Sequence, residues 1–163
     1  MRRLRFCSIY RGVYFERMAS LGMKHALVAM LAIVGPALAE DLPVNPAVTQ
    51  ETIGQTICVP GWTKTVRPPY TVSNAIKLEK LRAIGLTEAD KSRFQLDHRI
   101  PLALGGAPSD PRNFQLEPWE EAGQKDAIEA CLARAVCTGK ITLDEARRRI
   151  SANWREARKG CGG

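Results

Sequence analysis

The stretch FQLDHRIPLALGG, residues 94–106, decides the fold that this chain of 163 residues is expected to adopt. Polar and apolar residues alternate along its first half, which is typical of a strand with one buried side. Gly105 and Gly106 then open a loop rich in turn residues. Within the strand lies the pair Asp97-His98, and this histidine is the only one outside the N-terminal 39 residues.

The segments around this stretch predict further helices and one more strand. Pro118 suits the first turn of a helix, and Thr142 with Glu145 three residues later forms a capping box that starts another. Ser73 is expected to cap a helix that precedes the stretch. The predicted elements are therefore a helix over 74–85, strands over 93–104 and 113–118 that pair as a wide hairpin, and helices over 119–136 and from 143 onward.

The N-terminus has the layout of a leader. Residues 23–39 run from a short basic start through an apolar stretch to Ala37-Leu38-Ala39, which is the pattern of a secretory signal peptide cleaved after Ala39. A retained N-terminal anchor is the alternative. We expect a leader over 1–39, an N-terminal arm and irregular segment over 40–72, and the main domain over 73–163.

Cleavage changes what the charge predicts. The whole chain carries +7, but loss of the leader leaves 18 basic and 16 acidic residues, a net charge of +2. Net charge alone therefore does not indicate a nucleic-acid partner, and a local basic patch would be needed. We expect an exported protein, periplasmic or secreted, with no stable membrane insertion after cleavage.

The cysteines agree with export. An even number remains after cleavage: Cys58, Cys131, Cys137 and Cys161. In an oxidising compartment they are expected to form disulfides rather than remain free thiols. Three pairings are open, and we favour Cys58–Cys137 because it ties the N-terminal segment to the helical end.

Asp97 and His98 carry complementary chemistry. A carboxylate is a hard oxygen ligand for Mg²⁺ or Ca²⁺, and a neutral imidazole can take a proton from water near neutral pH. Together they supply the minimal parts for hydrolysing a phosphodiester. Neighbouring strand residues point to opposite sides, so a bulge or the strand end must bring both groups together. The glycines after the pair would let backbone approach a ligand. The alternative is a structural histidine that satisfies a loop carbonyl.

The segments LDHRIPLALGG, RNFQLEP and QKDAIE resemble the HNH-type nucleases, whose core is a ββα-metal hairpin and helix. The resemblance covers residues 94–130. The flanking segments ICVPGWTKTVRPP and VCTGKITLDEARRRISANW resemble small exported bacterial members. The resemblance implies an α+β fold with an HNH-like hairpin-plus-helix core, additional helices and disulfide staples.

The resemblance also implies roles for individual residues. His98 would be the general base, Asp97 a metal ligand, and Asn113 the residue that holds the loop and orients His98. The cation would be Mg²⁺ or Mn²⁺, with Zn²⁺ or Ca²⁺ as alternatives. The family has a further His or Asn ligand on the helix, but this chain has neither between Phe114 and Asn153. We choose Asp126 as the replacement, with Gln124 and Glu121 as alternatives.

Basic residues near these positions could bind nucleic acid. Arg99 is assigned to the catalytic site, where it would stabilise charge on the phosphate. Four residues are predicted to contact the nucleic-acid backbone: Arg112, Lys125, Arg148 and Arg155. The alternative is an ordinary exposed face with paired charges.

Two functions remain open. The first is a monomeric, metal-dependent endonuclease that acts on nucleic acid, DNA rather than RNA, with little sequence preference. The second is a non-catalytic exported module that retains the HNH-like scaffold and binds nucleic acid or protein.

Overall fold

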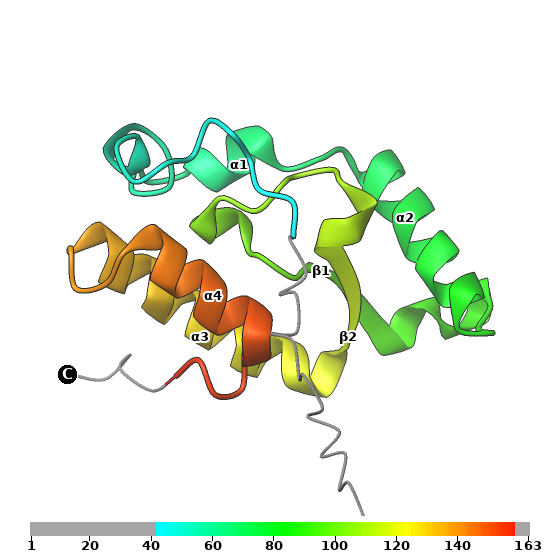
Figure 1. The fold of residues 1–163 in the computed structure, drawn as a ribbon. Helices are drawn as coiled ribbons and strands as arrows, with labels where there is room; N and C mark the ends of the chain where they lie inside the picture. Colours follow the sequence, from blue (N-terminus) through cyan, green and yellow to red (C-terminus); the bar gives the residue numbers. More distant parts are fainter. Residues whose placement is uncertain (1–41, 159–163) are drawn as a thin grey trace, which may run out of the picture. The chain divides into compact units, whose positions relative to one another are not determined.

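A two-stranded antiparallel hairpin followed by a long helix forms the centre of the fold. The computed structural model describes residues 42–158. Strand β1 (Phe94–His98) pairs with β2 (Phe114–Pro118), and helix α3 (Trp119–Cys137) follows β2 directly. Figure 1 shows α2 on one side of this hairpin and α3 with α4 on the other. The α+β fold and the hairpin-plus-helix order predicted from the sequence are confirmed.

Three more helices surround the hairpin. They are α1 (Trp62–Val66), α2 (Tyr70–Ala83) and α4 (Leu143–Asn153). Helix α4 begins as predicted, with the Thr142 hydroxyl accepting a hydrogen bond from the Glu145 amide at 3.2 Å. Helix α2 begins earlier than predicted, directly after Pro69, because the fixed backbone of a proline suits the residue before the first turn.

The first strand is shorter than predicted. β1 ends at His98, and the chain then turns through Pro101 into a short 3-10 turn at Leu102–Leu104. Leu102 and Leu104 are buried. Apolar residues in this loop therefore extend the core rather than the strand, which is why the hydrophobic pattern alone overestimates the strand.

Gly105 and Gly106 are required by packing within the protein. A Cβ atom on Gly106 would lie 1.8 Å from the carbonyl oxygen of Ile100, and one on Gly105 would lie 2.5 Å from a methyl group of Val48. Gly105 also has a φ of +72°. We expected these glycines to let a ligand approach the backbone. The contacts favour a packing role instead, because protein atoms already occupy the space beside both glycines.

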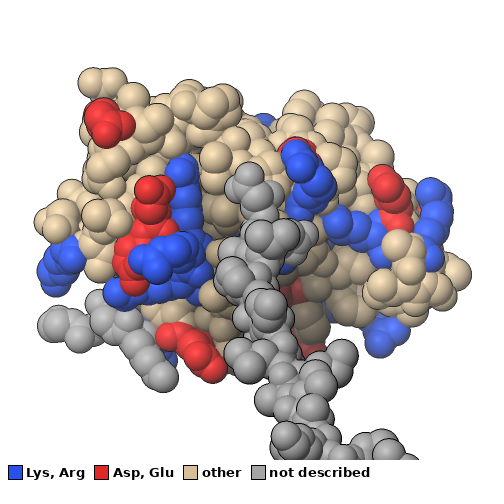
Figure 2. Space-filling view, viewed as in Figure 1, with Lys and Arg blue, Asp and Glu red and all other residues tan. Residues whose placement is uncertain are grey.

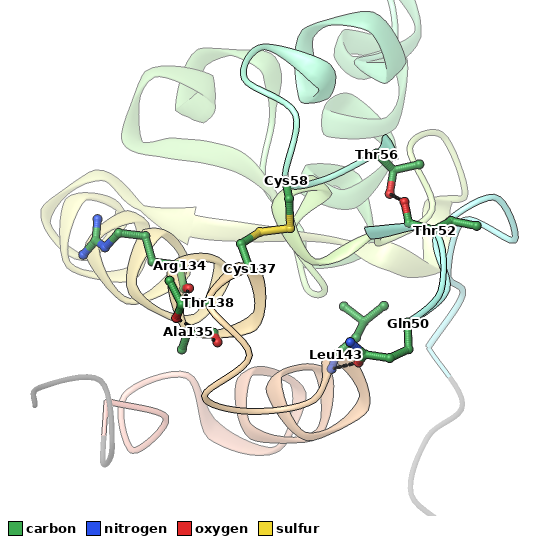
Figure 3. The surroundings of a disulfide bond; sticks show 9 residues. All are labelled: Gln50, Thr52, Thr56, Cys58, Arg134, Ala135, Cys137, Thr138 and Leu143. Carbon is green, nitrogen blue, oxygen red and sulfur yellow. Dashed lines mark hydrogen bonds between the residues drawn. A yellow bond between two sulfur atoms is a disulfide. The ribbon is translucent and has the colours of Figure 1, made fainter. Parts of the chain in front are cut away.

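The segment before residue 73 is part of the main domain and not a separate arm. Leu42, Val48 and Ile57 are buried in the same core as residues of α3 and α4. The Gln50 side chain accepts a hydrogen bond from the backbone amide of Leu143 at 2.8 Å (Figure 3). The expected N-terminal arm and irregular segment over 40–72 thus pack on the helices, because buried side chains hold them there.

A disulfide between Cys58 and Cys137 joins this segment to the end of α3 (Figure 3). The favoured pairing is thus confirmed, and Cys131 is also disulfide-bonded. These bonds are consistent with an oxidising compartment. Within residues 42–158, none of the helices has the length and apolar character needed to cross a membrane. The leader and its cleavage site lie outside the described residues.

Replacing both Cys58 and Cys137 by serine is expected to destabilise the fold. The bond closes a loop of 79 residues, and the chain-entropy relation gives about 4.5 kcal/mol for a loop of that length. Cys58 is half-buried and Cys137 is exposed, so the serine side chains themselves should cost little. Urea unfolding of the double variant and the oxidised wild type measures the difference. If the double variant loses less than about 1 kcal/mol of unfolding free energy, the disulfide does not stabilise the fold as expected.

Candidate active site

A cavity of about 140 Å³ lies at the end of β1, and it is the candidate active site. Asp97 and His98 both line it, which is possible because the strand ends at His98. Helix α3 adds Asp126 and Glu129 to its wall. Arg67, in the segment after α1, adds a positive charge. The cavity therefore combines one imidazole, three carboxyl groups and a guanidinium.

His98 is held so that one ring nitrogen is left as a proton acceptor. His98 is 6% exposed, and its ring packs against that of Phe114 in a tilted arrangement with 4.2 Å between centroids. Its Nε2 lies 3.0 Å from the carbonyl oxygen of Pro108. Since a carbonyl only accepts, Nε2 must carry the proton, and the neutral ring has its lone pair at Nδ1. No residue among 42–158 forms a hydrogen bond to Nδ1.

Burial lowers the pKa of His98. The carbonyl of Pro108 and the charge of Asp97 oppose this effect but do not overcome it, and the positive charges of Arg67 and Lys125 add to it. The neutral imidazole is therefore favoured near pH 7. A group that must accept a proton from water needs this form.

Asn113 fixes the loop to which His98 is bonded. It is fully buried, and its side-chain oxygen accepts a hydrogen bond from the Ile100 amide at 2.8 Å. Its side-chain nitrogen donates to the carbonyls of Ile100 and Ala107, each at 3.0 Å. Pro108, the partner of His98, follows Ala107 directly. Asn113 thus orients His98 through this loop and not by direct contact.

Lys125 lies at the centre of a buried charge cluster. Its ammonium is 2.6 Å from Asp97 Oδ2 and 2.9 Å from the backbone oxygen of His98, and it also bonds to Glu129. Burial alone would lower the pKa of Lys125, but Glu129 and Asp97 raise it above its usual value. The lysine is 1% exposed. Its predicted role as a backbone contact for nucleic acid does not agree with this position, because the side chain is buried and its ammonium is bonded to two carboxyl groups.

Glu129 is a site residue that the sequence reasoning missed. Burial raises its pKa to about 7, although the neighbouring Lys125 acts in the opposite direction. Its spacing of four residues from Lys125 on one helix was the available signal, because such pairs lie on the same face. The two residues then form an ion pair that places a carboxyl group on the cavity wall.

The donor atoms fit some cations better than others. Among residues 42–158, no three His, Cys, Asp or Glu side chains gather in the manner of a metal site. A Zn²⁺ site with a full set of protein ligands therefore does not fit. Mg²⁺ and Mn²⁺ sites often use one or two carboxylates, with water and substrate phosphate supplying the rest.

Asp126 and Glu129 meet this looser requirement, since both are carboxyl groups on the cavity wall. Asp97, the ligand expected from the sequence, has both oxygens engaged. Oδ1 accepts from the His98 amide at 2.8 Å, and Oδ2 is bonded to Lys125. The carboxyl groups thus fit a hard cation of the Mg²⁺ class, held mainly from α3.

The other predicted cations are not gathered at this cavity. Arg99 lines a different cavity, which it shares with Glu117 and Arg155. Arg112 pairs with Asp110 at 2.7 Å. Arg99 therefore does not line the cavity that holds His98, which differs from its expected place in the catalytic site.

Arg148 and Arg155 form ion pairs with acidic neighbours. Arg148 is bonded to Glu145, and Arg155 is bonded to Glu121 on α3. Figure 2 shows basic and acidic side chains interleaved over α4 on the face in view. This arrangement agrees with the alternative of an exposed face with paired charges, which weakens the case for backbone contacts there.

Comparisons with protein-family models, with curated proteins and with solved structures find no match to this chain.

Proposed function

We propose that this protein is an HNH-like, metal-dependent endonuclease that hydrolyses phosphodiester bonds of nucleic acid with little sequence preference. The observation that carries this is the placement of His98: its Nε2 is bonded to the Pro108 carbonyl, which leaves Nδ1 as the proton acceptor, and the residue lines a cavity that also holds Asp126 and Glu129. A general base beside carboxyl groups for a hard cation is the arrangement that phosphodiester hydrolysis needs.

In this mechanism His98 Nδ1 accepts a proton from the water that attacks phosphorus. The Pro108 carbonyl keeps the ring in the required tautomer and stabilises the imidazolium that forms. Lys125 holds the backbone oxygen of His98, which fixes the base relative to α3. A bound Mg²⁺ or Mn²⁺, held by Asp126 and Glu129, would neutralise phosphate charge and stabilise the leaving oxygen.

Plasmid nicking tests the proposed function. The chain without its leader should convert supercoiled DNA to open circles in Mg²⁺ or Mn²⁺, and a chelator should stop the reaction. A parallel assay with RNA of the same length tests the expected preference for DNA. Absence of cleavage of either substrate with Mg²⁺, Mn²⁺, Ca²⁺ and Zn²⁺ would reject the nuclease assignment.

A non-catalytic binding module is the second candidate, and the Lys125 cluster favours it. The ammonium already pairs with Asp97 and with one oxygen of Glu129, so much of the negative charge at the cavity is balanced without any metal. Calorimetry separates the two functions. A nuclease should bind Mn²⁺ and lose that binding in Asp126→Asn, whereas a module should bind nucleic acid equally well in a chelator and bind no Mn²⁺.

A further inference from the structure

We propose that Arg67, with Thr63 beside it, binds the phosphate group of the nucleic-acid strand at the His98 cavity. This inference rests on the proposed function, because it assigns the substrate-binding wall of the same site. Nothing in the sequence pattern singles out either residue. Both line the cavity from α1 and the residue after it, whereas the carboxyl groups of Asp126 and Glu129 line it from α3.

The backbone holds Arg67 in a fixed conformation. Arg67 directly follows α1, and its φ of −64° and ψ of 129° give it an extended backbone. Pro68 follows it, and the residue before a proline is restricted to such extended conformations. Thr63 lies four residues earlier, one helical turn away. The wall is therefore presented by a short helix that a rigid dipeptide, Pro68-Pro69, terminates.

The disulfide ties this wall to the helix that carries the acidic groups. Cys58 lies just before α1, and Cys137 is the last residue of α3. Figure 3 shows the bond joining the two segments. Arg67 and the carboxyl groups of Asp126 and Glu129 thus belong to elements that are covalently connected at one end.

Arg67 is the cation in this cavity that is available to a ligand. Lys125 is buried and bonded to two carboxylates, and it is absent from the cavity lining. Arg67 is exposed and has no hydrogen-bond or ion-pair partner among residues 42–158. A guanidinium can donate two parallel hydrogen bonds to phosphate oxygens, and the Thr63 hydroxyl supplies a third donor.

The size of the cavity limits what can enter. Its volume of about 140 Å³ is well below the roughly 300–1,000 Å³ of pockets that hold drug-sized ligands. That room suits one phosphate group and an attacking water, but not a stacked nucleobase. Recognition would then be of the backbone, in agreement with little sequence preference.

Binding of a fluorescein-labelled 20-nucleotide single-stranded DNA, measured by anisotropy in a chelator, tests this inference without cleavage. Arg67→Gln should weaken binding by about tenfold at low salt, because a charge-assisted bidentate contact is lost. The slope of log K against log salt should fall in magnitude by about 0.7, the value for one phosphate contact on a single strand. Lys64→Gln is the matched control, since Lys64 is an exposed cation of α1 outside the cavity lining.

Two further measurements locate the contact. Arg67→Lys should keep the slope of log K against log salt, because the charge remains. It should still weaken binding, because the planar pair of donors of the guanidinium is lost. Addition of the DNA to the wild type should shift the NMR signals of Thr63 and of the Gln95 side-chain amide, which both line the cavity. Equal affinities and slopes for Arg67→Gln and Lys64→Gln would overturn the inference, and they would do so whether or not the protein cleaves DNA.

Discussion

Replacing Lys125 by methionine is expected to destabilise the fold by about 3–5 kcal/mol at pH 8, because removal of one member of a buried ion cluster leaves the remaining charges without compensation. Asp97 and Glu129 would both be left without the ammonium that bonds them. Methionine matches the length of the lysine stem, so the lost interaction and not lost volume should dominate.

The loss of folding stability in Lys125→Met should be larger at high pH than at low pH. Removing the ammonium should raise the pKa of Glu129 further, because Lys125 acts to lower that pKa and it is already raised to about 7 in the wild type. A carboxyl group with a raised folded-state pKa favours folding below its unfolded value of 4.5, and this contribution is lost as the pH rises through the folded-state pKa. The variant should therefore be much closer to the wild type at pH 5 than at pH 8.

Urea unfolding at both pH values measures these differences. Arg134→Met is the matched control, because Arg134 is an exposed cation on the same helix. Its effect should stay within about 0.5 kcal/mol, as for most surface substitutions. Similar losses for the two variants would contradict the structural role assigned to Lys125.

The sequence predicts the hairpin and α3 well because their signals are local. Alternation over residues 94–98 and the turn residues around 105–112 mark the strands, and Pro118 marks the start of α3. Asn113 is also found from its place in the pattern, and its hydrogen bonds to Ile100 and Ala107 give the physical reason for an amide there.

The parts that the sequence does not predict depend on contacts between distant segments. The sequence indicates a surface cation at Lys125 because lysine is rarely buried, and its burial depends in part on Asp97, a partner 28 residues away. The sequence predicts only an irregular segment around Arg67, and the place of this residue at the cavity depends on how α1 packs. Hydrophobic patterning cannot report either arrangement, since both are set by tertiary structure.

Replacing His98 by glutamine is expected to lower the rate of plasmid nicking by about 10² to 10⁴-fold, the usual effect of losing a general base. Glutamine can still donate a hydrogen bond to the Pro108 carbonyl, but its side chain cannot accept a proton near pH 7. Calorimetric binding of Mn²⁺ should be unchanged, because Asp126 and Glu129 remain.

The pH profile and chemical rescue distinguish a base from a structural histidine. Because burial lowers the pKa of His98 from its ordinary value of 6.5, the acidic limb that His98 contributes to the wild-type rate should lie below that value. His98→Gln should lack that acidic limb. In His98→Gly, which leaves space beside Phe114, added imidazole should restore part of the rate. A glutamine variant as active as the wild type, or a glycine variant that imidazole does not rescue although it folds, would show that His98 does not take the proton.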